Sequence, residues 1–474
     1  MNFTDEINKK ISQLVSQIHD AQIYSYIMKE LFKQGIFSIS SVIKSFNILP
    51  DFNKSQIQTN FQKNIYKMKA FIKSIMPNNE IYYVLSCIFG AFLGDAMGAF
   101  CEFEKPNPKN YRNIFNNEIT VIGGEKGQIT DDSEMALSLA YAIMDTPLKE
   151  ALNVNYIYFY YGAWFNTSPL DFGNTTKNAL KIFNFEQFIP NMNNFQAIES
   201  KILQDNYESL SNGFLMRKSP FIAWFYYRFY HEINDAFDKF DNNKLFNLYK
   251  KIKDLSFEDN RCTNPNDIAN IISGIYCLMA LMAIKQIPPN IIISKIFELC
   301  ERFSFSNGSN EKQIYEYIQF YIKMFNSPNF DLYTYFGDLK SSDNVFNKMG
   351  YYLHAFKLTL YFLYKFDHIE KKNPKRKFRE IMNQICNLGG DTDTNCCIVG
   401  TVIGPLIGME NFGVEFDKML NVVPRERQIY SVVMIVLFVI YLKRSNRDNN
   451  LIYNDKYFLQ QILTMIYGNV DLSY

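Results

Sequence analysis

Apolar residues recur along most of the chain at the three- and four-residue spacing of helices, whereas alternating strand patterns are scarce. Only residues 120–122 have a weak strand pattern. No pattern repeats at a fixed period of 20 to 50 residues, which argues against solenoid folds. A large all-α domain is therefore the predicted fold class. The apolar or amphipathic runs predict helices over 135–144, 156–165, 221–229, 268–284, 351–364, 396–407 and 429–442.

The first 80 residues have a different character from the rest. Ile7, Ile11, Leu14 and Ile18 predict a helix with one apolar stripe, and no catalytic pattern occurs before residue 80. We therefore expect a helical N-terminal extension over 1–80, which could dock a partner, and a catalytic domain over 81–474.

Polar stretches separate the predicted helices of the second part. Residues 234–253 and 307–347 are expected to be connectors or peripheral helices. The basic run over 371–377 predicts a solvated loop, with a phosphate or partner contact as the alternative.

Composition and charge narrow the class of protein. Lys and Arg total 49 and Asp and Glu 48, a net charge of +1, so nothing in the overall charge favours a nucleic acid or an anionic membrane as partner. With 47% hydrophobic and 16% aromatic residues, extensive disorder is excluded. Eight cysteines without a CxxC pair, and an acidic start unlike a signal peptide, predict a cytoplasmic protein with reduced thiols. The uncharged run 429–442 is shorter than the roughly 20 residues that span a bilayer, so no membrane anchor is expected.

Three segments concentrate acids, hydroxyls and glycines within otherwise apolar sequence, where a buried polar site would be encoded. In the first, 90–102, three glycines at four-residue spacing form a flat row on a predicted helix, and each costs about 1 kcal/mol relative to alanine. The row permits close approach of a second helix or a ligand. Helix packing alone explains the glycines Gly90, Gly94 and Gly98, but not Asp95 and Glu102 on the same helix.

The second and third segments, 127–135 and 389–395, each lead into an apolar helix. Capping of a helix start would account for one acid and for Ser133. It does not require Thr130 and Asp131 as well. Each segment alone could be a capping device; together they place hard oxygen ligands at two helix starts.

Carboxylates and hydroxyls without His or Cys suit Mg²⁺, Mn²⁺ or Ca²⁺ better than zinc. All four histidines lie outside the three segments, which argues against a zinc hydrolase or a Ser-His-Asp enzyme. An EF-hand is excluded because Cys396 and Val402 stand where Gly and Glu are required. A DxDx[TV] phosphatase start fails because its fifth position is Asn395.

If the second and third segments meet, four aspartates crowd together. Two of them 4 Å apart would repel by about 4 kcal/mol at an effective dielectric constant of 20. Two divalent cations would neutralise the four charges, with threonine hydroxyls as neutral ligands. The residues concerned are Asp131, Asp132, Asp391 and Asp393, with Thr130 and Thr394.

These motifs, together with 212–217 (NGFLMR), resemble the ADP-ribosylglycohydrolase family in order and separation from Gly90 to Gly408. The resemblance implies a compact all-α fold with a binuclear magnesium, or manganese, site between helices that binds ADP-ribose. Glu102 matches the acid that faces the metals in relatives. The positions that match the family's metal ligands are Thr130, Asp131, Asp132, Asp391, Asp393 and Thr394.

Residues 169–176 resemble a loop of the bacterial dinitrogenase reductase-activating branch, in which an aspartate contributes to catalysis. Asp171 matches that aspartate, although a turn or helix-capping role stays open. Tyr351 is similar in position to a stacking surface for adenine. Backbone N–H groups at helix starts suit anions, so the expected contacts to the diphosphate and the rest of ADP-ribose are Gly127, Asn212, Gly213, Met216, Arg217, Gly389 and Gly390.

The resemblance implies a hydrolase that releases ADP-ribose from modified protein side chains. Its partners would be the ADP-ribosylated protein and the ADP-ribose product. Two metals would hold the ribose hydroxyls and activate water, and Glu102 or Asp171 would transfer protons. An arginine guanidinium is the favoured leaving group and a serine oxygen its rival. The other alternative is a non-catalytic protein that binds ADP-ribose or has a structural role.

Overall fold

The computed structural model describes residues 80–108, 120–146, 152–165, 169–181, 195–238, 240–305, 309–371 and 373–420, together with 435, 436, 438, 439, 442 and 443. Within these residues the protein is built from helices and has no strand, which confirms the all-α fold class. The predicted helix over 7–18 and most of 429–442 lie outside the described residues. The division of the chain at residue 80 therefore stays a prediction.

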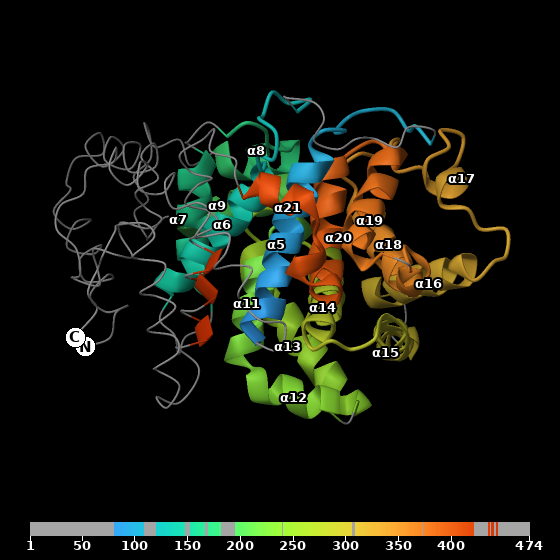
Figure 1. The fold of residues 1–474 in the computed structure, drawn as a ribbon. Helices are drawn as coiled ribbons and strands as arrows, with labels where there is room; N and C mark the ends of the chain where they lie inside the picture. Colours follow the sequence, from blue (N-terminus) through green and yellow to red (C-terminus); the bar gives the residue numbers. More distant parts are fainter. Residues whose placement is uncertain are drawn as a thin grey trace, which may run out of the picture.

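Two helices in direct backbone contact form the centre of the domain: α5 (Glu80–Gly98) and α20 (Thr392–Ile407), which lie side by side in Figure 1. Their contact is made by glycine. A Cβ atom on Gly90 would lie 2.4 Å from the carbonyl oxygen of Gly400, and one on Gly94 would lie 2.3 Å from that of Cys396. No larger side chain fits at these distances. The predicted glycine row is therefore a helix-packing surface.

The remaining helices surround this pair (Figure 1). On one side lie α6 (Asp131–Asp145), α7 (Val154–Phe165), α8 (Asn174–Leu180) and α9 (Phe195–Asn206). On the other lie α15 (Pro289–Glu301), α16 (Asn310–Phe325), α17 (Leu332–Phe336), α18 (Tyr352–Tyr364) and α19 (Pro374–Leu388). The rest are α10 (Gly213–Met216), α11 (Ser219–Arg228), α12 (Tyr230–Asp238), α13 (Asn242–Asn260), α14 (Asp267–Ile284) and α21 (Val414–Met419).

Most predicted helices in the described part are confirmed, with shifts of a few residues at their ends. Two predictions are wrong. Residues 120–122 form a turn rather than a strand. The basic run 371–377 is not a loop throughout, because α19 begins at Pro374, a residue suited to the first helical turn. The polar stretches 234–253 and 307–347 contain peripheral helices, one of the two expected alternatives.

Among the described residues, α5 and α14 are long and apolar enough to cross a membrane, with mean hydropathies of 1.5 and 1.8. Their apolar windows are 94% and 83% buried inside the protein. Core helices of this length have the same composition, because they are apolar on every face.

Candidate active site

Three chain segments converge where α5, α6 and α20 end or begin. The first residues of α20 pack against the end of α5, because a Cβ atom on Gly98 would lie 2.4 Å from the Cα atom of Asp393. The start of α6 is bonded to Asp95 of α5. Helix α5 ends at Gly98, so Glu102 lies in the following turn and not on the helix, as the sequence suggested. The turn directs its carboxylate to the same site.

The acidic side chains form two groups that share Asp393. Asp95, Asp132 and Asp393 make one, and Glu102, Asp391 and Asp393 the other; within each, one carboxylate oxygen per residue lies within 4.8 Å of the others. The hydroxyl of Thr130 lies 3.1 Å from a carboxylate oxygen of Asp132 and 3.5 Å from one of Asp393. The Thr394 hydroxyl lies 3.4 Å from the same Asp132 oxygen.

Two buried oxygens in this cluster, Oδ1 of Asp132 and Oε2 of Glu102, have no hydrogen-bond partner among the described residues. Unpaired buried carboxylate oxygens are costly unless a cation or donor satisfies them. Hard oxygen donors in this number suit magnesium or manganese. The residues present therefore fit a divalent metal site, as the sequence predicted.

Asp95 has a different role from the other acids, and the sequence reasoning did not assign it one. Its carboxylate accepts hydrogen bonds from the backbone N–H of Thr130 at 3.0 Å and of Ser133 at 3.2 Å, and from both of their hydroxyls. Thr130, the N-cap residue of α6, makes no capping bond of its own. Asp95 thus caps α6 from a neighbouring helix and fixes Thr130 beside Asp132.

The crowding of carboxylates raises their pKa values. Burial, and then the charges of Asp391 and Asp171, raises the pKa of Glu102 to about 8. Burial is also the main cause that raises the pKa of Asp131, Asp132 and Asp393 well above the ordinary range. Without cations, this cluster therefore favours protonated over charged carboxyl groups.

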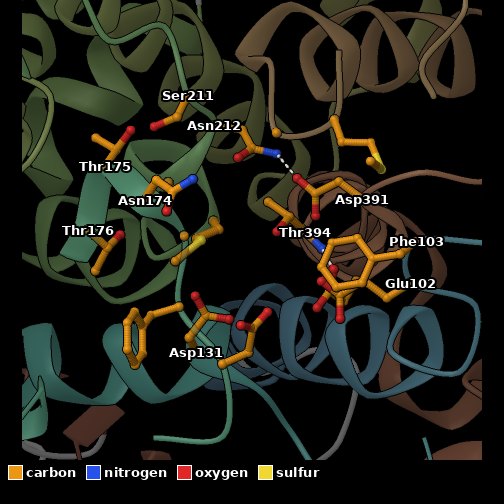
Figure 2. Close-up of a pocket in the computed structure, with 18 residues that line it drawn as sticks. Glu102, Phe103, Asp131, Asn174, Thr175, Thr176, Ser211, Asn212, Asp391 and Thr394 are labelled. Carbon is orange, nitrogen blue, oxygen red and sulfur yellow. Dashed lines mark hydrogen bonds between the residues drawn. The ribbon is translucent and has the colours of Figure 1, made fainter. Parts of the chain in front are cut away.

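The acidic cluster opens into a cavity of about 410 Å³. Figure 2 shows its two sides: Glu102, Phe103 and Asp391 lie opposite a hydroxyl- and amide-rich wall. No Lys, Arg or His is among the described residues that line it. The lining consists of Glu102, Phe103, Asp131, Asp171, Phe172, Gly173, Asn174, Thr175, Thr176, Ser211, Asn212, Gly213, Met216, Met349, Gly350, Asp391, Asp393 and Thr394.

Many of the predicted site residues meet in this cavity. Asn212 joins its two sides, because its Nδ2 donates to Oδ2 of Asp391 at 2.6 Å (Figure 2). Thr130 and Asp132 lie directly behind the lining, within the acidic cluster. The predicted residues that line the cavity are Glu102, Asp131, Asp171, Asn212, Gly213, Met216, Asp391, Asp393 and Thr394.

Gly389 and Gly390 do not line the cavity, contrary to their predicted diphosphate contact. A Cβ atom on Gly389 would lie 2.3 Å from the carbonyl oxygen of Glu104. Gly390 donates its N–H to that same oxygen, and its own carbonyl accepts the N–H of Phe103 at 2.8 Å. These glycines therefore let the turn that carries Glu102 lie against the chain that enters α20.

Gly127 and Tyr351 also lie outside the lining. Gly127 has a φ of +86° in the turn before α6. The backbone of Tyr351 pairs with Ser211, and its ring lies 5.4 Å from that of His354. Their predicted ligand contacts are thus replaced by contacts that shape the turns around the cavity.

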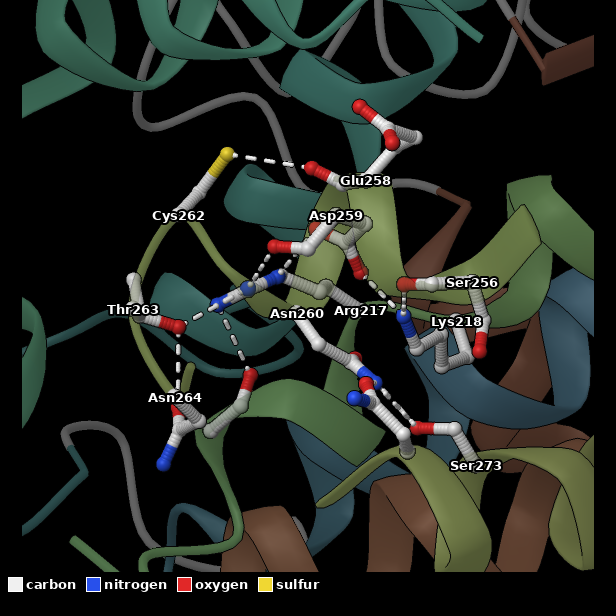
Figure 3. Close-up of polar contacts among 12 residues, drawn as sticks. Arg217, Lys218, Ser256, Glu258, Asp259, Asn260, Cys262, Thr263, Asn264 and Ser273 are labelled. Atoms are coloured by element: carbon white, nitrogen blue, oxygen red, sulfur yellow. Dashed lines mark hydrogen bonds and ion pairs between the residues drawn. The ribbon is translucent and has the colours of Figure 1, made fainter. Parts of the chain in front are cut away.

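Arg217 is fully buried and faces away from the cavity, which corrects its predicted contact with the ligand. Its Nε donates to Asp259 Oδ1 at 2.9 Å, and its Nη2 to the Thr263 hydroxyl at 2.9 Å (Figure 3). Its Nη1 donates to the carbonyl oxygen of Gly213 at 3.0 Å. Lys218 also pairs with Asp259. Arg217 thus supports the cavity wall from behind.

Sequence reasoning missed several residues of the cavity. The neutral wall includes 174–176 and Ser211, each adjacent in sequence to a residue that was predicted. That adjacency was the available signal. Phe103, Met349 and Gly350 follow no motif and are brought to the cavity by turns.

Comparison with known proteins agrees with this geometry. Residues 77–432 match the ADP-ribosylglycohydrolase family. A protein of Acanthamoeba polyphaga mimivirus, provisionally named an ADP-ribosyl glycohydrolase, is 26% identical over 355 residues, covering 72% of this chain and 92% of the relative. The ADP-ribosyl-dinitrogen reductase glycohydrolase of Rhodospirillum rubrum is 30% identical over 105 residues, covering 22% and 35%. A solved structure described as an ADP-ribosylglycohydrolase-related protein complex aligns with 78% of this chain and 99% of its own, at 17% identity and a TM-score of 0.49.

The family match extends over most of the chain and includes all three acidic segments. The chain therefore belongs to the ADP-ribosylglycohydrolase family and is a glycosidase-type hydrolase.

Proposed function

We propose that this hydrolase removes ADP-ribose from modified side chains of proteins in a reaction that requires two Mg²⁺ ions. The observation that carries the proposal is the pair of acidic groups that share Asp393 beside a cavity of about 410 Å³. Small-molecule sites in proteins are of this size. Mn²⁺ would suit the same oxygen ligands.

The residues that would hold the ions are those at the starts of α6 and α20. They are Thr130, Asp131, Asp132, Asp391, Asp393 and Thr394. When bound, the ions would orient the ribose hydroxyls and activate a water molecule. The unpaired oxygens of Asp132 and Glu102 support a cation-bearing site.

The chain's own residues divide the remaining tasks. The hydroxyls and amides of Thr175, Ser211 and Asn212 provide neutral donors for the phosphates of ADP-ribose. Glu102 and Asp171 both line the cavity and are the carboxyl groups placed for proton transfer. As the bond from C1 of the ribose to the side chain breaks, one acid gives a proton to the leaving atom. The other takes a proton from the water whose oxygen bonds to C1.

We favour an arginine-linked substrate, with serine-linked ADP-ribose as the rival. Two observations support arginine. The Rhodospirillum rubrum relative matches this chain at 30% identity over 105 residues, and its branch suggested the role of Asp171. The cavity lining also includes five acidic residues and no basic one, which suits a cationic leaving group. A cytoplasmic location is proposed from cysteine usage and the acidic chain start alone.

The first experiment measures ADP-ribose release from arginine-linked and serine-linked substrates, with and without Mg²⁺. Asp391→Ala should abolish release and Mg²⁺ binding, whereas Asp254→Ala, at an exposed position on α13, should change neither. Mg²⁺-dependent release retained by Asp391→Ala would overturn the metal-site assignment. If ADP-ribose binds but neither linkage is cleaved, the protein is a binding protein.

A further inference from the structure

We propose that Phe103 determines the leaving group of the reaction: its ring packs against the flat, positively charged guanidinium of an arginine side chain. The inference rests on the proposed function and deepens it, because it assigns recognition of the leaving group to one residue. No sequence motif pointed to this role.

The backbone of Phe103 is held in a conformation that side chains other than glycine rarely adopt. Its φ is +59°, in the left-handed region. A pair of hydrogen bonds maintains it: Phe103 donates its N–H to the carbonyl oxygen of Gly390, and Gly390 donates its N–H to that of Glu104. Of the four described non-glycine residues with positive φ, only Phe103 lines the cavity.

The side chain of Phe103 gains little from folding. It is 49% exposed, so much of its apolar surface stays in water. A glycine would relieve the backbone, and a polar residue would suit the solvent. A strained backbone that presents an exposed aromatic ring at a cavity is the kind of arrangement found at functional sites.

The surroundings of the ring indicate what it contacts. Figure 2 shows it next to Glu102, on the acidic side of the cavity and across from Thr175 and Ser211. The neutral donors on that far wall suit the ADP-ribosyl part of the substrate. An aromatic face beside a carboxylate is a favourable site for a guanidinium, which is planar, always charged and weakly hydrated. A serine leaving group has no such surface.

The first test is Phe103→Leu, which keeps an apolar side chain but removes the ring. We expect KM for an arginine-linked substrate to rise about 10-fold, within the range of cation–π contacts. Kd for ADP-ribose, which carries no leaving group, should stay within about twofold. An equal loss in Kd for ADP-ribose would place the ring against the nucleotide, and an unchanged KM would exclude contact; either overturns the inference.

A second pair of variants separates recognition from folding. Phe103→Gly and Glu370→Gly each place glycine at a left-handed position, because Glu370 has a φ of +42° and lies outside the cavity. Both should leave Tm equal to or above that of the wild type. Only Phe103→Gly should raise KM. A drop in Tm for Phe103→Gly that exceeds the drop for Phe103→Leu would show that the residue serves the fold.

Failure of the proposed function is read from the wild type. If the wild type cleaves only serine-linked ADP-ribose, the guanidinium assignment is overturned while the hydrolase remains. If it cleaves neither linkage, the inference is tested by binding of L-arginine and L-serine to the ADP-ribose-saturated protein, measured by ligand-detected NMR. We expect binding of L-arginine alone, weakened several-fold in Phe103→Leu. Equal binding of both, or no loss in the variant, overturns it.

Discussion

Removal of one buried charge from the acidic cluster should stabilise the metal-free protein. Asp132 is fully buried, and its nearest carboxylate oxygens on Asp95 and Asp393 lie within 4.8 Å. Two charges at that separation repel by about 3.5 kcal/mol at an effective dielectric constant of 20. Asp132→Asn removes both repulsions and keeps an oxygen that accepts from the hydroxyls of Thr130 and Thr394.

We expect the free energy of unfolding of the metal-free protein to rise by about 1–3 kcal/mol in Asp132→Asn at pH 8. The gain is smaller than the summed repulsions, because proton uptake already relieves part of them in the wild type. That uptake follows from the raised pKa values of Asp132 and Asp393.

The same pKa shifts fix the sign of the pH dependence. A carboxyl group with a raised pKa in the folded state holds a proton that the unfolded chain releases above about pH 4. The folded state then binds more protons than the unfolded state, so the stability of the metal-free protein falls as pH rises through this window. Asp132→Asn should make that fall less steep.

The assay is urea unfolding in EDTA and in saturating Mg²⁺, at pH 6 and pH 8. Mg²⁺ should stabilise the wild type, because it binds only the folded state, and should not stabilise Asp132→Asn. Asp254→Asn, at an exposed position, should behave as the wild type. A variant that is less stable than the wild type in EDTA, or that keeps the full response to Mg²⁺, would refute the charge-crowding argument.

Three further predictions concern the fold. Gly94→Ala should lower the free energy of unfolding by about 1–3 kcal/mol in urea titrations, because its Cβ would meet backbone at 2.3 Å, whereas Gly173→Ala, with open space around its Cβ, should cost less than 1 kcal/mol. Burial lowers the pKa of His354 to about 3, so its neutral form stabilises the fold above pH 6.5 and that stability is lost as pH falls; His354→Gln should reduce the acid loss by about 1.4 kcal/mol per pH unit between 6 and 4. Arg217→Met should cost about 3–5 kcal/mol, against under 0.5 kcal/mol for Lys201→Met at an exposed pair, both measured by urea unfolding.

Local sequence signals were reliable where the residues concerned act through their own chain segment. Apolar periodicity predicted the central helices, because one face or all faces of each had to be buried. The oxygen-rich starts of α6 and α20 predicted a metal site, because only a cation offsets several buried carboxylates in one place.

Errors arose where a residue's function depends on a partner far along the chain. Arg217 follows the Asn212–Gly213 motif and was therefore assigned to the ligand, but Asp259 on α13 holds its guanidinium away from the cavity. Gly389 and Gly390 were assigned to the diphosphate, yet they make room for the backbone of Glu104. Composition alone does not distinguish a glycine that faces a ligand from one that faces another backbone.

The sequence by itself determined the helical fold class, the acidic ligand set and the family. Each of these follows from residue types at short spacing, which act through periodicity and charge. The tertiary structure alone decided which carboxylates share Asp393, that Asp95 caps α6, and that the turn after α5 presents Phe103 beside Glu102. The physical reason is the glycine contact between α5 and α20: it brings segments almost 300 residues apart to backbone separation, and no local pattern specifies that distance.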